Sequence, residues 1–272
     1  MTGLSPMLER LAAVTAPLRG RLGVDGVTLV GLLAGLATVL VLAVGFTDLL
    51  DDVLDGEGIA AFDGRVNQWL AGHRESWLTD VLLALTRMGN ADVQAAVLAV
   101  VCIASAAAAR SWFPIVIGSA GGAGIGLVIV VAKELIGRPR PAQPFAMITA
   151  GGYSFPSGHA TGAAAIGLLC AWMLCRWVVH GWPLRIAVWT LAIATVGLIG
   201  FSRPYLGVHF PTDVLAGWTL GAGWAVTVIV LASWRSSRSR QEPAARSAAD
   251  ATASAPRSEE RRVGKECLRL CR

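Results

Sequence analysis

The chain has 272 residues, of which 54% are hydrophobic and only 15% charged, and its mean hydropathy is +0.59. A soluble domain carries about 25% charged residues, so this composition excludes an ordinary soluble protein and, for most of the chain, intrinsic disorder. The formal net charge of +5 does not indicate nucleic acid as a partner, because membrane proteins concentrate arginine in cytoplasmic loops.

Six stretches without charged residues follow one another along the chain, each close to the length of about 20 apolar residues that a helix needs to cross a bilayer. They are residues 27–46, 93–109, 111–132, 160–175, 186–201 and 214–234. We therefore predict an all-α fold, a polytopic bundle of six transmembrane helices over residues 27–234. A cleaved signal peptide is the alternative for the first stretch, but no small-residue cleavage site follows it.

Arginine is concentrated on one side of these spans. If the N-terminus is inside, the inner side carries Arg10, Arg19, Arg21, Arg110, Arg176, Arg185, Arg235, Arg238 and Arg240. The positive-inside rule then predicts a multi-pass protein of a bacterial plasma membrane with both termini cytoplasmic. Residues 1–26 would form a cytoplasmic segment, and residues 235–256, rich in Ala, Ser and Arg, a disordered cytoplasmic tail.

The segment between the first two spans, residues 47–92, is polar and acidic at first and then amphipathic. Its apolar residues recur at helical spacing: Trp77, Leu78, Val81, Leu82, Leu85 and Met88. We expect a helix here that lies on the outer membrane surface. Such a helix either packs against the bundle or caps a site, and packing is the expectation.

Two predicted outer loops contain most of the unusual polar residues. The loop before the fourth span contains Lys133, Arg140, Pro141, Pro156, Ser157, Gly158 and His159. The loop before the sixth span contains Ser202, Arg203, His209 and Asp213. Both loops fall on the same face of the membrane, because two spans separate them. Their side chains can therefore converge.

Three of these residues, Lys133, Arg140 and Arg203, are cations suited to an anion, since arginine holds phosphate oxygens with a two-pronged fork. Ser157 adds a hydroxyl, and Gly158 precedes the start of a span, where free backbone N–H groups favour negative charge. This set predicts a phosphate-binding site.

Two histidines add reactive groups to that site. His209 lies four residues before Asp213, so in a helical turn the carboxylate would accept the Nδ1 proton and leave Nε2 free as a nucleophile. His159, from the other loop, would protonate a leaving oxygen as a general acid. Taken singly, such residues are commonly membrane anchors or interfacial histidines. Their joint spacing predicts a catalytic site.

The three motifs, K-x6-RP, PSGH and SR-x5-H-x3-D, extend over residues 133–213 and resemble the signature of the type 2 phosphatidic acid phosphatase (PAP2) superfamily. The resemblance implies that His209 attacks phosphorus to give a phosphohistidine, that Asp213 orients it, and that His159 protonates the leaving group. The residues implied to bind the phosphoryl oxygens are Lys133, Arg140, Ser157, Gly158 and Arg203. The resemblance also implies that no metal or cofactor is used, which agrees with the sequence, where no carboxylate cluster suited to magnesium stands beside these motifs.

The predicted function is hydrolysis of a lipid phosphate monoester or diphosphate, with the lipid reaching the site from the outer leaflet. A polyprenyl diphosphate, a phosphatidic acid and a phosphatidylglycerol phosphate are candidates among which the sequence does not choose. One alternative is a phosphotransferase that uses the same site. A transporter or flippase is a further alternative, but the charged residues stand at span ends rather than near the midplane.

The last residues, 257–272, have a different origin in our interpretation. Residues 257–267 read as the in-frame translation of a widely used sequencing adapter, so we interpret 257–272 as an artefact of sequence assembly. Its removal takes away six basic and three acidic residues, which lowers the formal charge from +5 to +2 and leaves Lys133 as the only lysine. The alternative is a charged tail that binds anionic lipid.

Overall fold

A computed structural model describes residues 26–141 and 146–254. The expected N-terminal segment, apart from Gly26, and the residues interpreted as adapter-derived lie outside this description. Among the described residues, six helices are long and apolar enough to cross a membrane, which confirms the predicted six-span, all-α fold. They are α2 (Gly26–Asp55), α5 (Ala91–Ala109), α6 (Phe113–Ile136), α7 (Gly158–Met173) together with the π-helical turn η2 (Leu174–Val178) that continues it, α8 (Trp182–Tyr205) and the part of α9 (Pro211–Ser254) that runs to Ser237.

The helices extend beyond the predicted apolar stretches, because backbone hydrogen bonds continue where the side chains become polar. At the end of α6, for example, the helix includes Lys133 and stops only at Gly137, whose φ is +64°. Glycine adopts this left-handed conformation without strain. The chain therefore leaves α6 abruptly and directs Arg138 and Arg140 back across the end of the bundle.

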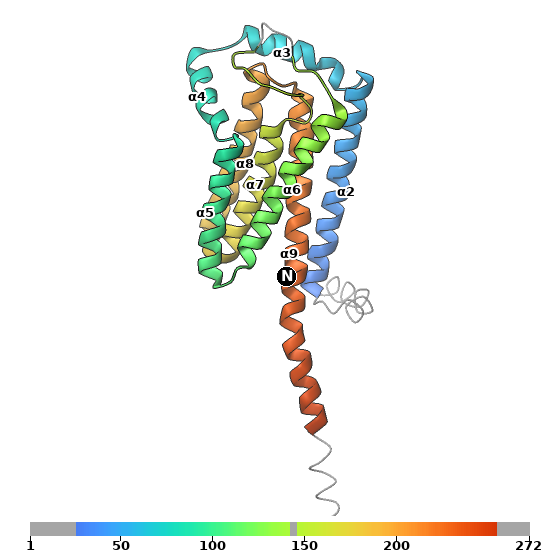
Figure 1. Cartoon of the computed structure of the whole chain (residues 1–272), viewed down its shortest axis with the longest axis vertical. Helices are drawn as coiled ribbons and strands as arrows, with labels where there is room; N and C mark the ends of the chain where they lie inside the picture. The colour runs from blue at the N-terminus through green and yellow to red at the C-terminus, as the bar shows by residue number, and fades with distance from the viewer. Residues whose placement is uncertain (1–25, 142–145, 255–272) are drawn as a thin grey trace, which may run out of the picture. The chain divides into compact units, whose positions relative to one another are not determined.

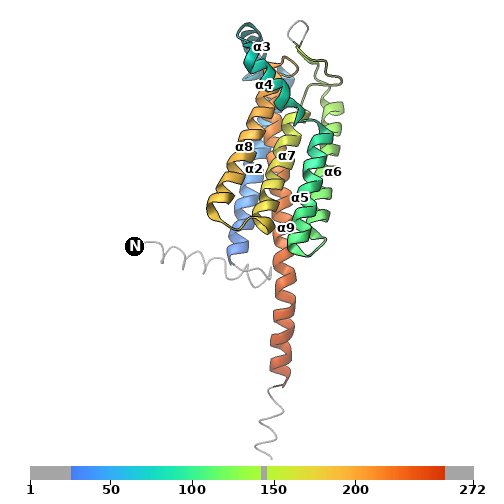
Figure 2. The same ribbon diagram turned by 90° about the vertical axis from the view of Figure 1, so that its left-hand side faces the viewer.

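Residues 35–230 form one compact unit, which contains the helical bundle. Within it, α7 packs against α5, α6 and α8, and Figure 2 shows α7 between α8 and the pair α5 and α6. Half of the α7 span is buried, the largest share among the six spans. Small residues permit this packing: a Cβ added at Gly221 of α9 would lie 2.3 Å from the carbonyl oxygen of Thr161.

A layer of short helices lies across one end of this bundle (Figure 1). It comprises η1 (Ala60–Phe62), α3 (Asp63–Gly72) and α4 (Ser76–Arg87), of which α4 is the predicted amphipathic helix. Leu70 of α3 and Leu82 of α4 form a buried cluster with Tyr205 and Leu206 at the end of α8. This cluster fixes the layer over the end of the bundle where α6 and α8 end and α7 and α9 begin.

The other compact unit comprises residues 1–34 and 231–272. In its described part, the Thr28 and Ser237 hydroxyls are hydrogen-bonded at 3.0 Å. The expected disordered tail differs from the structure, in which α9 continues as a helix to Ser254. The prediction of disorder rests on the low content of apolar residues, which argues only against burial of this segment. Ala, Arg, Gln and Glu nevertheless favour the helical backbone, and the segment is rich in them.

Candidate active site

A polar cavity of about 510 Å³ lies where the layer of short helices meets the bundle. Six of the predicted site residues line it: Lys133, Arg140, Gly158, His159, Arg203 and His209. The other two predicted residues, Ser157 and Asp213, are fully buried. The structure therefore brings together residues from α6, α7, α8 and two loops, as the sequence motifs predict.

His209 and Asp213 are joined by the expected hydrogen bond, with 3.2 Å between Nδ1 and Oδ2. The other ring nitrogen, Nε2, lies 3.0 Å from Nη1 of Arg140. A guanidinium can only donate, so Nε2 carries the lone pair and Nδ1 carries the proton that it donates to Asp213. This is the tautomer that a nucleophilic histidine requires.

The surroundings of His209 also set its charge. Burial lowers the pKa of the imidazole to about 4, although the hydrogen bond to Asp213 and the charge of that carboxylate oppose the shift. The positive charges of Arg140 and Arg203 lower the pKa further. Burial lowers the pKa of Arg140 too, against the effect of Asp213. The imidazole is therefore neutral near pH 7.

The second carboxylate oxygen of Asp213 is held by Arg138, a residue that our sequence analysis did not place in the site. Arg138 donates from Nη1 to Oδ1 of Asp213 (2.6 Å) and from Nη2 to Oδ2 of Asp63 (2.8 Å). Asp63, on α3 and only 3% exposed, also accepts hydrogen bonds from the backbone N–H and hydroxyl of Thr212. The result is a buried chain of alternating charges that ends at His209.

Two further residues from the 47–92 segment position the site. The Nε2–H of His159 donates to Oδ1 of Asn90 (3.1 Å), and the imidazole lies against Gly89, where an added Cβ would be 2.5 Å from Cδ2. Only glycine permits this close approach. The expectation that this segment simply packs is therefore incomplete, because its last residues, including Thr86 and Asn90, line the cavity.

Two buried donors of the predicted phosphate site lack an acceptor among the described residues. Arg203 is 4% exposed and donates from Nη1 to Oγ1 of Thr86 (2.6 Å), but its Nε is buried without a partner among the described residues. The same is true of the Ser157 hydroxyl. A buried donor without an acceptor is costly, and a phosphoryl oxygen would satisfy it. In the described part of the chain, no group of three or more His, Cys, Asp or Glu side chains forms a candidate metal site.

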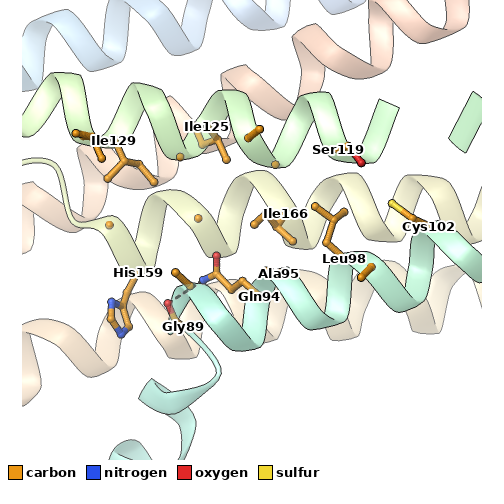
Figure 3. Close-up of a pocket in the computed structure, with 18 of the residues that line it drawn as sticks. Gly89, Gln94, Ala95, Leu98, Cys102, Ser119, Ile125, Ile129, His159 and Ile166 are labelled. Atoms are coloured by element: carbon orange, nitrogen blue, oxygen red, sulfur yellow. Dashed lines mark hydrogen bonds between the residues drawn. The ribbon is translucent and has the colours of Figure 1, made fainter. Parts of the chain in front are cut away.

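An apolar cavity of about 740 Å³ adjoins the polar one (Figure 3). The two share Gly158 and His159, and the apolar cavity runs from there between α5 and α6 to Cys102. Its walls are largely aliphatic, and the buried Gln94 donates to the Gly89 carbonyl (3.0 Å). A ligand with a phosphate head and a hydrocarbon chain would match both cavities at once.

Comparisons with known proteins identify similar chains. The PAP2 superfamily model matches residues 95–237. Phosphatidylglycerophosphatase B of Bacillus subtilis (strain 168) is 32% identical over 149 residues, which cover 54% of this chain and 72% of that protein. Undecaprenyl-diphosphatase of Sulfolobus acidocaldarius is 40% identical over 74 residues, or 26% of this chain and 29% of the relative.

A solved structure is similar as well. The crystal structure of a transmembrane PAP2-type phosphatidylglycerolphosphate phosphatase from Bacillus subtilis superposes with a TM-score of 0.65 and 26% sequence identity. The match covers 71% of this chain and 94% of that one.

Proposed function

The chain belongs to the PAP2 superfamily, and on that premise we propose that it hydrolyses a lipid phosphate monoester, or the terminal phosphate of a lipid diphosphate, through a phosphohistidine on His209. It is a phosphoric monoester hydrolase of the membrane. The observation that carries the finer proposal is the junction of the polar cavity with the apolar one at Gly158 and His159. This arrangement suits a substrate whose phosphate reaches His209 while its chain stays between α5 and α6.

In the first step, Nε2 of His209 attacks phosphorus and the bond from phosphorus to the lipid oxygen breaks. Arg140, 3.0 Å from the attacking nitrogen, is placed to hold the phosphoryl oxygens as their charge redistributes. Protonated His159 gives its proton to the leaving oxygen. Asp213 stabilises the positive charge that develops on His209, as the carboxylate does in a catalytic triad.

Lys133 and Arg203 complete the phosphate site, with Ser157 and Gly158 beside it. The buried Nε of Arg203 and the hydroxyl of Ser157, both without partners among the described residues, would gain acceptors when the phosphate binds. Charge-assisted bonds of this kind are roughly twice as strong as neutral ones. A bound phosphate would therefore supply the hydrogen-bond acceptors that these two buried donors lack in the free site.

In the second step, water attacks the phosphohistidine and the bond from phosphorus to Nε2 breaks. His159, now neutral, takes the proton of that water. One water is consumed, and the products are inorganic phosphate, the dephosphorylated lipid and the original His209. An acceptor alcohol in place of water would make the enzyme a phosphotransferase.

We propose phosphatidylglycerol phosphate as the first substrate to test, because the relative with 72% coverage is a phosphatidylglycerophosphatase by name. Phosphatidic acid and a polyprenyl diphosphate remain candidates, the latter because another relative is an undecaprenyl-diphosphatase. We also propose that residues 27–234 form the catalytic domain. Its site would face the extracytoplasmic side, with both termini in the cytoplasm.

The direct test is phosphate release from these three lipids by purified protein in detergent. We expect release by the wild type with chelator present, and a loss of at least about a thousandfold for His209→Ala. His73→Ala is the matched control, because His73 is exposed and stacks on Trp69 away from the cavity. Release from none of the lipids would contradict the phosphatase proposal, and an active His209→Ala variant would contradict the mechanism.

A further inference from the structure

A further cavity lies where α7 ends and α8 begins, and it has no part in the proposed reaction. It measures about 510 Å³ and is lined chiefly by aromatic and basic residues: Trp172, Arg176, Trp182, Arg185 and Trp189. The 24 residues of α8 run from this cavity to the active site, and at 1.5 Å per residue they span about 36 Å. That length separates the two surfaces of a membrane.

The two arginines of this cavity are held differently. Arg185 donates from Nη2 to the Cys175 carbonyl (2.6 Å) and from Nε to the Val179 carbonyl (3.1 Å), which ties α8 to the π-helical turn Leu174–Val178 that ends α7. Arg176 is exposed and lies over the Trp177 ring, 5.7 Å from its centroid. Within the part of the chain that the structure describes, the side chain of Arg176 has no hydrogen bond or ion pair.

Charge is distributed very unevenly between the two ends of this unit. All eleven Asp and Glu residues of residues 35–230 lie at 48–92, 134 and 213, on the segments that form the active-site end. The opposite end carries Arg110, Arg176 and Arg185. No carboxylate occurs in the sequence between Glu134 and Asp213, so the helices around the cavity supply no counter-charge of their own.

We propose that this cavity binds the phosphate head group of an anionic phospholipid in the leaflet opposite the substrate. Basic pockets between transmembrane helices bind such head groups, and tryptophan rings prefer the same depth. Arg176 would pair with the phosphate, Trp182 would line the rim, and the exposed Ile186 and Ile193 below them would contact the chains. Free phosphate shares the head-group chemistry but lacks those chains.

The bound lipid would join the end of α7 to the start of α8. These two helices carry His159 and Arg203 at their other ends, so the lipid would stabilise the pair that frames the active site. The expected result is a higher unfolding temperature, since a ligand that binds only the folded state stabilises it.

The test is a thermal-unfolding titration of the purified protein in neutral detergent with phosphatidylglycerol, phosphatidylcholine or inorganic phosphate. The variant is Arg176→Gln, and Arg110→Gln is its matched control, which removes the same charge from the same end outside the cavity. Phosphatidylglycerol is expected to bind about fivefold more weakly to Arg176→Gln and equally well to Arg110→Gln. Any binding of the lipid at the active site is common to the wild type, Arg176→Gln and Arg110→Gln, so it does not contribute to the difference in affinity between them.

A second variant, Trp182→Ala, leaves the charge unchanged and is also expected to weaken phosphatidylglycerol binding. The proposal is overturned if Arg176→Gln and Trp182→Ala bind this lipid as the wild type does, or if Arg110→Gln loses as much affinity as Arg176→Gln. It is likewise overturned if phosphatidylcholine or inorganic phosphate stabilises the wild type as strongly as phosphatidylglycerol.

Discussion

His209 illustrates how the surroundings of one residue prepare it for chemistry. Its Nδ1 proton is directed to Asp213, while Nε2 faces Arg140. The guanidinium thus marks the nitrogen that would attack phosphorus and keeps it unprotonated, because a cation beside it opposes protonation. Ionisation and tautomer are both set before a substrate arrives.

The corresponding prediction concerns nitrogen-15 NMR of histidine-labelled protein, which has only four histidines. We expect His209 to hold its proton on Nδ1 at pH 7 and to titrate with a pKa of about 4, below the usual 6.5. The unfolded chain then binds this proton more tightly, so folding stability falls as the pH drops from about 6.5 to about 4. The signal is assigned by its loss in His209→Ala. A midpoint near 6.5, or a proton on Nε2, would refute this description.

Asp63 is connected to His209 through two intervening residues: Asp63 pairs with Arg138, Arg138 pairs with Asp213, and Asp213 contacts His209. In the Asp63→Asn variant, the Arg138 guanidinium keeps only one carboxylate partner, Asp213, and its altered position would disturb the orientation of that carboxylate. Loss of a hydrogen bond to a charged group costs about 2 kcal/mol, so kcat should fall roughly 30-fold. KM should stay within about twofold, because Asp63 does not line the cavity.

The matched control for this variant is Asp80→Asn, an exposed carboxylate on α4. Steady-state kinetics of both variants on the same lipid phosphate give the comparison, with the unfolding temperature measured in parallel. If Asp63→Asn lowers only the unfolding temperature, or if Asp80→Asn loses as much activity, the chain of charges has no role in positioning His209.

At the scale of elements, the pair α5 and α6 has two roles. The polar ends of these helices supply Asn90 and Lys133 to the site. Their apolar faces form walls of the apolar cavity in Figure 3, which we call the groove. Both roles follow from helix geometry, because residues three or four apart share a face. The same pair can therefore hold a phosphate and a hydrocarbon chain.

Filling the groove should separate these two roles. Ala95 lines the groove and Ala96, its neighbour on α5, does not, although both are exposed. Ala95→Trp should lower kcat/KM for a long-chain lipid phosphate roughly 30-fold, which corresponds to a loss of about 2 kcal/mol in transition-state stabilisation. Hydrolysis of a short-chain phosphate should change by less than about twofold, and Ala96→Trp should affect neither substrate. Equal losses on both substrates would indicate a distorted site instead of a blocked groove.

At the scale of the whole molecule, the distribution of charge bears on orientation. All eleven carboxylates of residues 35–230 lie at the active-site end, whereas the opposite end carries three arginines and no carboxylate. The positive-inside rule, applied to the inner arginines predicted from the whole sequence, places this opposite end in the cytoplasm. The active site would then face outward, where a lipid of the outer leaflet reaches it.

Thiol labelling tests this orientation in a variant in which every cysteine of the chain has been replaced. Gly72→Cys, exposed at the end of α3, should react with an impermeant reagent in intact cells. Ser111→Cys, exposed in the turn between α5 and α6, should react only after lysis. The opposite pattern would invert the topology and move the proposed anionic-lipid site to the outer leaflet.

Much of this protein is determined by local sequence. The number of spans follows from apolar runs whose length must match the bilayer, and the phosphate-site residues follow from three short motifs at span ends. The hydrogen bond between His209 and Asp213 is also local, because it joins residues four apart in a single turn. Such features depend on few degrees of freedom and can be recognised without a fold.

Only the tertiary structure decided which distant residues complete the site. Asp63 and Asn90 come from a segment that carries no motif, and they reach Arg138 and His159 across 75 and 69 residues of sequence. The groove between α5 and α6, and the cavity where α7 ends and α8 begins, likewise arise from the way neighbouring helices pack. Sequence spacing contains no record of such contacts, because they depend on how helices far apart in the chain meet.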